Sequence, residues 1–247
     1  MGELKNYFLQ NKGNLIDKWI HYFDIYEFYF SSFRNKPICL LEIGVFQGGS
    51  LQMWKNYFHS ESEIFGIDFN PECKKFESDN VYIHIGSQAD VSFLKEFISV
   101  TPKFDIIIDD GSHKVDHQKI SFEILFDHLN EGGIYICEDT HTSYWSNYGG
   151  GFKVDSSFVE YSKNKIDDLN AWHSRSPQFK KNKFTENIKS IHFYDSMVVI
   201  MKGKVSKPIS KRTGKFVIDP GSLVEPEFKK KNFLKSIFNK AIKFLKI

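Results

Sequence analysis

Apolar residues recur along the chain in short continuous runs that alternate with amphipathic stretches. The runs have the length of strands and lie at 38–46, 63–68, 81–86, 104–110 and 134–139. Between them, the apolar positions at 51–58, 91–99 and 114–129 are spaced as in helices. Strands that are apolar throughout, as at 104–110, are typical of parallel sheets covered on both faces. The alternation predicts an α/β fold with a doubly wound, Rossmann-like and mostly parallel sheet.

Both ends of the chain extend this pattern. Residues 15–33 are rich in aromatic side chains and predict one or two helices packed on the core. Residues 188–203 predict a hairpin, turning at Asp195 and Ser196, that adds an antiparallel edge and brings the sheet to seven strands. We expect an N-terminal helical segment over 1–36, a core domain over 37–203, a linker over 204–226 and a basic amphipathic helix over 227–247.

Composition narrows the class of protein. With 247 residues, of which 41% are hydrophobic and 26% charged, the chain can bury a core and is not a disordered or low-complexity polymer. Its three cysteines form no C-x-x-C pair, so the sequence supports neither a disulfide framework nor a zinc site and favours the cytoplasm. The sequence has neither an apolar run of 18 residues nor a secretory signal, so we expect no membrane span.

Charge is distributed unevenly. Residues 202–247 hold 13 Lys or Arg against 3 Asp or Glu, whereas residues 1–201 hold 20 against 28. An acidic body does not match nucleic acid, and we expect no such partner. The basic amphipathic segment at 227–247 favours either peripheral binding to the inner face of a membrane or a protein partner, with packing on its own domain as a third alternative, and the sequence leaves all three open.

Polar residues follow the predicted strands, where open α/β sheets bind their ligands. The first strand leads into Glu42-x-Gly44-x-x-x-Gly48, which is neither a dinucleotide fingerprint nor a triphosphate loop. Asp68 ends the second strand and is placed to accept hydrogen bonds from two ribose hydroxyls. This edge of the sheet therefore predicts a site for a nucleoside without a phosphate.

Three acids follow the fourth and fifth strands. Asp110, Glu138 and Asp139 would bring hard carboxylate oxygens together, a ligand set for Mg²⁺ and not for zinc. His113 lies three residues beyond Asp110. By itself it reads equally well as a general base or as a histidine that caps or packs on the following helix.

Several segments together resemble a known family. LEIGVFQGGSLQMW, GID, GSQAD, FDIIIDDGSH and IYICEDTHTSYW resemble class I S-adenosylmethionine-dependent methyltransferases, most closely the metal-dependent sugar O-methyltransferases of macrolide biosynthesis, over about residues 17–203. The resemblance implies a Mg²⁺-dependent (or Mn²⁺-dependent) enzyme that methylates a sugar hydroxyl, on a bacterial surface glycan or a glycosylated metabolite, and that forms a homo-oligomer as relatives often do. The alternative is a non-catalytic subunit that binds a nucleoside or sugar on the same fold. The intact Asp110, His113, Glu138 and Asp139 argue against it.

The resemblance also implies roles for single residues. Asp110, Glu138 and Asp139 would hold the metal, and His113 would be the base, with His117 and His141 as nearby alternatives. Tyr144, Trp145 and Tyr148, which precede three glycines, would form an aromatic lid on the acceptor.

The implied cofactor contacts follow the first four strands. They comprise Glu42 and Gly44 beneath the methionine, with Gly48 and Ser50 in the same turn, Asp68 at the ribose, Gln88 and Asp90 at the adenine, and Asp109, which is either cofactor-side or structural. Relatives often read G-D-Q where this chain has Gly86-Ser87-Gln88, so one acidic contact near adenine is absent here. Lys18, His21, Tyr22 and Tyr26 match a stretch that lines the site in relatives, although packing of an aromatic helix explains them nearly as well.

Overall fold

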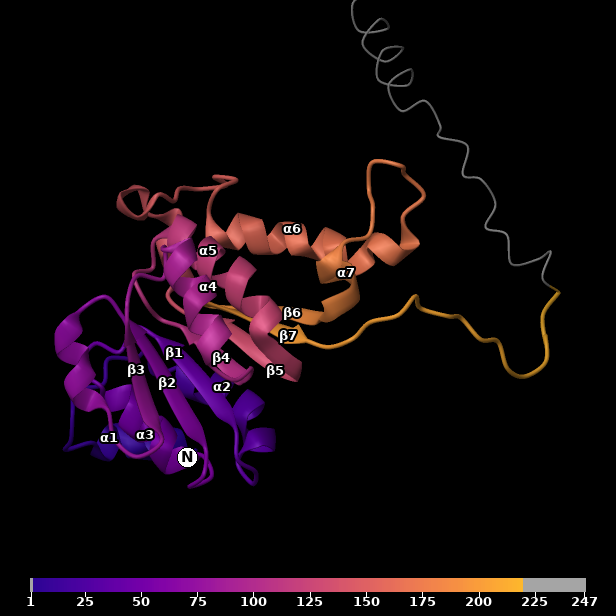
Figure 1. The fold of residues 1–247 in the computed structure, drawn as a ribbon. Coiled ribbons are helices and arrows are strands. Elements are labelled where there is room, and N and C mark those ends of the chain that lie inside the picture. The colour runs from indigo at the N-terminus through magenta and orange to yellow at the C-terminus, as the bar shows by residue number, and fades with distance from the viewer. Residues whose placement is uncertain (1, 220–247) are drawn as a thin grey trace, which may run out of the picture. The chain divides into compact units, whose positions relative to one another are not determined.

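The computed structural model describes residues 2–219 (Figure 1). It divides into two compact units, Met1–Lys207 and the residues from Pro208 onward. The predicted N-terminal helical segment therefore belongs to the same unit as the predicted core domain. The predicted amphipathic helix at 227–247 and the end of the predicted linker lie outside the described residues. No helix within residues 2–219 is long and apolar enough to cross a membrane.

The first unit is built on a seven-stranded sheet with the order β3-β2-β1-β4-β5-β7-β6. The strands are β1 (Cys39–Ile43), β2 (Glu63–Asp68), β3 (Val81–Ile85), β4 (Phe104–Asp109), β5 (Leu129–Cys137), β6 (Ile188–Tyr194) and β7 (Met197–Lys202). β1 to β5 are parallel, and β7 pairs antiparallel with both β5 and β6. The predicted mostly parallel sheet and its antiparallel C-terminal hairpin are confirmed.

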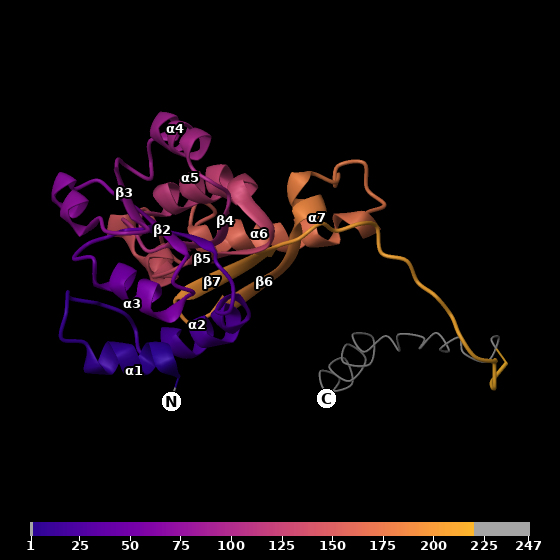
Figure 2. The same cartoon turned by 60° about the horizontal axis from the view of Figure 1, so that its bottom comes forward.

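Helices cover both faces of the sheet, as Figures 1 and 2 show. The helices are α1 (Glu3–Gln10), α2 (Tyr22–Phe30), α3 (Gly49–Tyr57), α4 (Val91–Val100), α5 (Val115–Leu125), α6 (Phe158–Asn170) and α7 (Lys183–Asn187). One apolar core joins α1, α2 and α3 to the sheet, with Trp54 and Tyr26 fully buried in it. A second core joins α4, α5 and α6 to the opposite face around Phe122.

Three boundaries differ from the predictions. Helix α1 lies within the predicted N-terminal helical segment, 1–36, although the sequence located helices there only over 15–33. Helix α2 begins at Tyr22, and the predicted helical turns before it are irregular backbone. Strand β5 begins at Leu129, where the sequence predicted the end of a helix. Residues 130–133 form an irregularity in the β4–β5 pairing, which runs from Phe104↔Leu129 directly to Ile106↔Ile134.

The strand order identifies where a ligand can bind. From β1 the sheet extends through β2 and β3 on one side and through β4 and β5 on the other. This reversal between β1 and β4 opens a crevice beyond their carboxyl ends. Ile43 of β1 pairs with Asp109 of β4, so the loops that follow them start side by side.

Candidate active site

One large cavity of about 1180 Å³ lies at this switch point. Residues following each of the five parallel strands line it, among them Gly44, Asp68, Ser87, Asp110 and Glu138. The irregular segment before α2 contributes Asp17, Lys18, Trp19 and Ile20. The volume exceeds that of a typical single-ligand pocket, so the cavity can take two small molecules.

Asp68 organises the end of the cavity beside β1 and β2. Its carboxylate accepts hydrogen bonds from the backbone N–H groups of Val45 (2.9 Å), Phe46 (3.0 Å) and Asn70 (2.9 Å). Each carboxylate oxygen can accept more than one hydrogen bond, so Asp68 can still receive hydroxyl groups from the cavity. It thus fixes the turn after β1 and offers a nucleoside a place to bind.

The two glycines of that turn are packed closely against other parts of the protein, so neither position has room for a Cβ atom. Gly44 has φ of 95°, and a Cβ there would lie 2.1 Å from the backbone oxygen of Asp110. Gly48 has φ of 73°, with the Phe76 ring against its Cα. Gly44 is therefore required for the close approach of the loops after β1 and β4, and Gly48 for the turn that starts α3.

Only some predicted cofactor residues face the cavity. Gly44, Asp68 and Gln88 line it, whereas the others do not: Glu42, Gly48, Ser50, Asp90 and Asp109. The Asp90 side chain caps α4 by accepting from Ser92 N and Phe93 N. The Asp90 side chain thus caps a helix, a contact that differs from the predicted contact with adenine.

Asp109 is fully buried in a polar network. It accepts hydrogen bonds from Ser121, from the Tyr135 hydroxyl (2.8 Å) and from Gln88 Nε2 (2.9 Å). Burial raises its pKa despite these donors. Gln88 Oε1 in turn accepts a hydrogen bond from Ser112 N (2.7 Å), so this network stabilises the loop that follows β4. Of the two readings left open for Asp109, the structural one matches its contacts.

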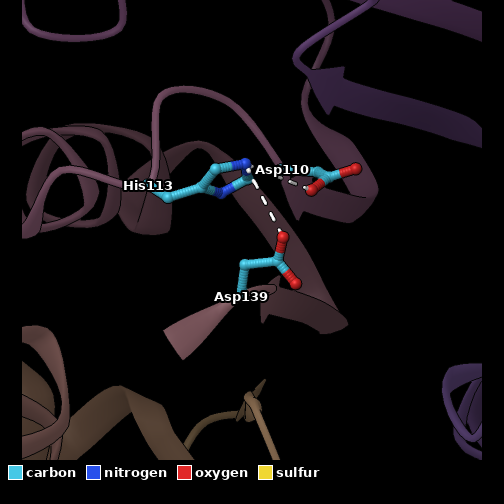
Figure 3. A group of neighbouring side chains, drawn as sticks. All are labelled: Asp110, His113 and Asp139. Atoms are coloured by element: carbon cyan, nitrogen blue, oxygen red, sulfur yellow. Dashed lines mark ion pairs between the residues drawn. The ribbon is translucent and has the colours of Figure 1, made fainter. Parts of the chain in front are cut away.

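Asp110, His113 and Asp139 converge at the other end of the cavity (Figure 3). His113 Nε2 lies 3.7 Å from Asp139 Oδ2 and 4.0 Å from Asp110 Oδ1. One donor atom from each residue falls within 4.8 Å of the other two. These three predicted site residues, from the loops after β4 and β5, are brought together.

Glu138 lies beside this group but turns toward Lys18 and Tyr26. It accepts hydrogen bonds from Lys18 Nζ (2.9 Å) and from the Tyr26 hydroxyl. Burial raises the pKa of Glu138 to about 8, against the attraction of Lys18. Its predicted part in a metal site stays a prediction.

Lys18 places one ammonium group among three carboxylates. Its Nζ lies 2.5 Å from Asp110, 2.9 Å from Glu138 and 3.6 Å from Glu42, and its side chain is only 2% exposed. Burial opposes the charged form, but Asp110 and Glu138 raise the pKa of Lys18 well above its ordinary value. This buried cation offsets charges from the ends of three adjacent strands.

Tyrosine hydroxyls from α2 hold the acids after β5. Tyr22 donates to Asp139 Oδ1 (2.8 Å), and Tyr26 donates to Glu138. The sequence offered two interpretations of Lys18, Tyr22 and Tyr26, as site residues or as core packing. In the structure all three are buried and also contact the acids of the site. Their 92- to 120-residue separation from the acids is why spacing alone could not pair them.

The side of the cavity where the sequence predicted an acceptor is aromatic. Trp145 and Tyr148 line it as predicted, together with Trp19, while Tyr144 does not. The His141 ring lies edge-on to both Trp19 (5.9 Å between centroids) and Trp145 (4.7 Å). The predicted loop is two short 3₁₀ turns, Thr140–Tyr144 and Ser146–Tyr148.

The residues present fit a nucleoside cofactor and a hard cation. Asp68 offers a carboxylate to a ribose at one end of the cavity, and Asp110 and Asp139 offer carboxylate oxygens at the other. The His113 Nδ1 atom is buried without a hydrogen-bond partner in the described chain, so its imidazole is not engaged in a structural network. This donor set suits Mg²⁺ or Mn²⁺ better than zinc.

Comparisons with known proteins agree with this geometry. Residues 41–140 match a family model described as a methyltransferase domain. The chain is 34% identical over 205 residues to the 8-demethyl-8-(2-methoxy-α-L-rhamnosyl)-tetracenomycin-C 3'-O-methyltransferase of Streptomyces olivaceus, covering 77% of this chain and 52% of that protein. It is 33% identical to the demethylmacrocin O-methyltransferase of Streptomyces fradiae, covering 76% of this chain and 51% of that protein.

Among solved structures, the chain is similar to the MycE methyltransferase from the mycinamycin biosynthetic pathway in complex with Mg and SAH. The TM-score is 0.73 at 30% identity, with 82% of this chain and 54% of that chain covered. The chain thus spans about half the length of the curated relatives that it matches.

Proposed function

The chain carries a methyltransferase domain of the class I, S-adenosylmethionine-dependent type, and from this premise we propose that it transfers a methyl group to a sugar hydroxyl. The observation that carries this proposal is the single cavity that joins Asp68 and the turn at Gly44 to Asp110, His113 and Asp139. The acceptor we propose is a neutral glycoside, either a glycosylated metabolite or a surface glycan.

Residues at one end of the cavity would bind the methyl donor, and residues at the other end would bind the cation. Asp68 would accept the ribose hydroxyls and hold the methyl donor, and Asp110, Glu138 and Asp139 would hold the divalent cation. Such a cation supplies Lewis-acid stabilisation of an alkoxide. Trp145 and Tyr148 would pack on the apolar face of the sugar and exclude water from the reacting atoms.

His113 would act as the general base through Nε2. The proton of the acceptor hydroxyl passes to His113 as the oxygen forms its bond to the methyl carbon and the carbon–sulfur bond breaks. Asp139, 3.7 Å from Nε2, would stabilise the imidazolium that results. Positioning of the hydroxyl beside the methyl group would contribute further to the rate.

The test combines binding with transfer. Isothermal titration calorimetry with S-adenosylhomocysteine (SAH), with and without Mg²⁺, is run on wild type, Asp68→Ala and Asp110→Ala. We expect wild type to bind, Asp68→Ala to lose at least about tenfold in affinity, and Asp110→Ala to bind SAH like wild type. Transfer of labelled methyl groups to neutral glycosides should occur in wild type, be lost in Asp110→Ala and fall in Asp68→Ala when the methyl donor is limiting. No SAH binding by wild type would overturn the proposal and favour a non-catalytic binding subunit.

A further inference from the structure

Of the three convergent residues Asp110, His113 and Asp139, two hold backbone conformations that L-amino acids rarely adopt. His113 has φ of 55° and Asp139 has φ of 51°. Both are therefore in the left-handed region, where a side chain carries steric strain. Such strain persists only where the surrounding structure enforces it. The contacts of these two backbones should then show what enforces it.

Thr142 contacts both backbones. Its hydroxyl lies 2.8 Å from the carbonyl oxygen of His113 and 2.9 Å from that of Asp139. Since a hydroxyl has one proton, it donates to the two carbonyls in turn or shares its proton between them. The backbone N–H of Thr142 also donates to the Asp139 oxygen (3.1 Å), and the residue is only 2% exposed. Thr142 thus ties together the loops after β4 and β5.

The side chain of His113 provides no comparable anchor. Its Nδ1 is buried without a hydrogen-bond partner among the described residues. Its Nε2 lies 3.7 Å from Asp139 and 4.0 Å from Asp110, beyond hydrogen-bond length. The position of the imidazole therefore depends on the backbone of His113, and that backbone is held by Thr142.

We propose that Thr142 is a positioning residue of this site: its hydroxyl holds His113 and Asp139 in their left-handed conformations and so sets the separation of imidazole and carboxylate. The inference rests on the proposed function, because the separation matters only if both side chains act together. Thr142 lines the same cavity, but its hydroxyl is directed to the carbonyl oxygens of His113 and Asp139, so it acts through the two residues that it links.

The experiment compares four variants with wild type. Thr142→Val keeps the shape and removes the hydroxyl, Thr142→Ala is a smaller hydroxyl-free variant, and Thr142→Ser restores the hydroxyl. Thr140→Val is the matched control, because Thr140 is equally buried in the same turn and no hydrogen bond of its hydroxyl to either carbonyl is found in the described chain. The readouts are Mn²⁺ affinity by electron paramagnetic resonance, SAH affinity by calorimetry, and kcat and KM for methyl transfer.

We expect Thr142→Val and Thr142→Ala to lose about 10- to 100-fold in Mn²⁺ affinity or kcat, the usual effect of removing a partner that orients site residues. SAH affinity and acceptor KM should stay within about twofold of wild type, and Thr142→Ser should recover most of the loss. Thr140→Val should behave like wild type.

The possible failures are distinguishable. If wild type binds SAH and Mn²⁺ but the hydroxyl-free variants match Thr140→Val, the role of Thr142 is refuted and the proposed function stands. If both hydroxyl-free variants also lose SAH affinity, or if Thr142→Ser is no better than they are, Thr142 is a general structural residue and the inference is overturned. If wild type binds neither probe, the proposed function fails and the inference fails with it.

Discussion

The buried ammonium of Lys18 offers the strongest test of how the acidic site is stabilised. We consider the substitution Lys18→Met, which keeps the length and most of the volume of the side chain and removes its charge. In the native protein Lys18 Nζ lies within 3.6 Å of Glu42, Asp110 and Glu138. Glu42 and Glu138 are 0% and 1% exposed, so neither can recover its hydration when the ammonium is lost.

Removing one partner from a buried ion pair typically costs about 3–5 kcal/mol. Glu138 can relieve part of this cost by taking up a proton, since burial already raises its pKa to about 8. We therefore expect the lower end of the range, about 3 kcal/mol. For a protein of this size such a loss lowers Tm by about 6–12 °C.

The assay is urea unfolding followed by tryptophan fluorescence, with thermal unfolding in parallel. The control is Lys163→Met, which removes an exposed ion pair to Glu160 within one helix and should cost less than about 1 kcal/mol. Adding Mg²⁺ should raise the Tm of Lys18→Met more than that of wild type, because a cation near Asp110 replaces part of the lost charge. If Lys18→Met is as stable as the Lys163→Met control, the ammonium of Lys18 does not stabilise the acidic site.

Three further predictions concern the proposed reaction. His113→Gln should lower kcat by roughly 10²- to 10⁴-fold with SAH affinity unchanged, and a kcat near that of wild type would remove His113 as the base. Trp145→Ala should raise the acceptor KM by about tenfold through loss of its aromatic contact, whereas Phe152→Ala, whose ring is 79% exposed outside the cavity, should not; equal KM values would argue against an acceptor role for Trp145. Treatment with EDTA should abolish transfer but leave SAH binding intact, with recovery on adding Mg²⁺ or Mn²⁺, and transfer that persists in EDTA would exclude a required metal.

The sheet could be predicted from sequence because its parallel strands are almost wholly apolar. β4, with Ile106, Ile107 and Ile108 all fully buried, is the clearest case. Helix α1 buries only Leu4, so the sequence did not locate it within the predicted helical segment at 1–36. The glycines at 132 and 133 indicated a helix end where the chain makes an irregular strand. The local pattern of apolar residues predicts which positions are buried. It does not predict how the pairing of β4 with β5 accommodates the extra residues at 130–133.

The candidate site was predictable where its residues follow strands and not where they arrive from elsewhere. Asp110, His113 and Asp139 lie at the ends of adjacent strands, so the topology alone brings them together. The contact of Lys18 with the acids spans about a hundred residues of sequence. Spacing cannot reveal such a contact, nor the link that Thr142 makes between two carbonyls.

We propose that one cavity holds the methyl donor and a divalent cation side by side. Crystals grown with SAH and Mn²⁺ test it directly through the anomalous scattering of manganese. We expect an anomalous peak bound by oxygens of Asp110, Glu138 and Asp139 and a ribose within hydrogen-bond distance of Asp68. A peak elsewhere, or SAH bound away from Asp68, would contradict it.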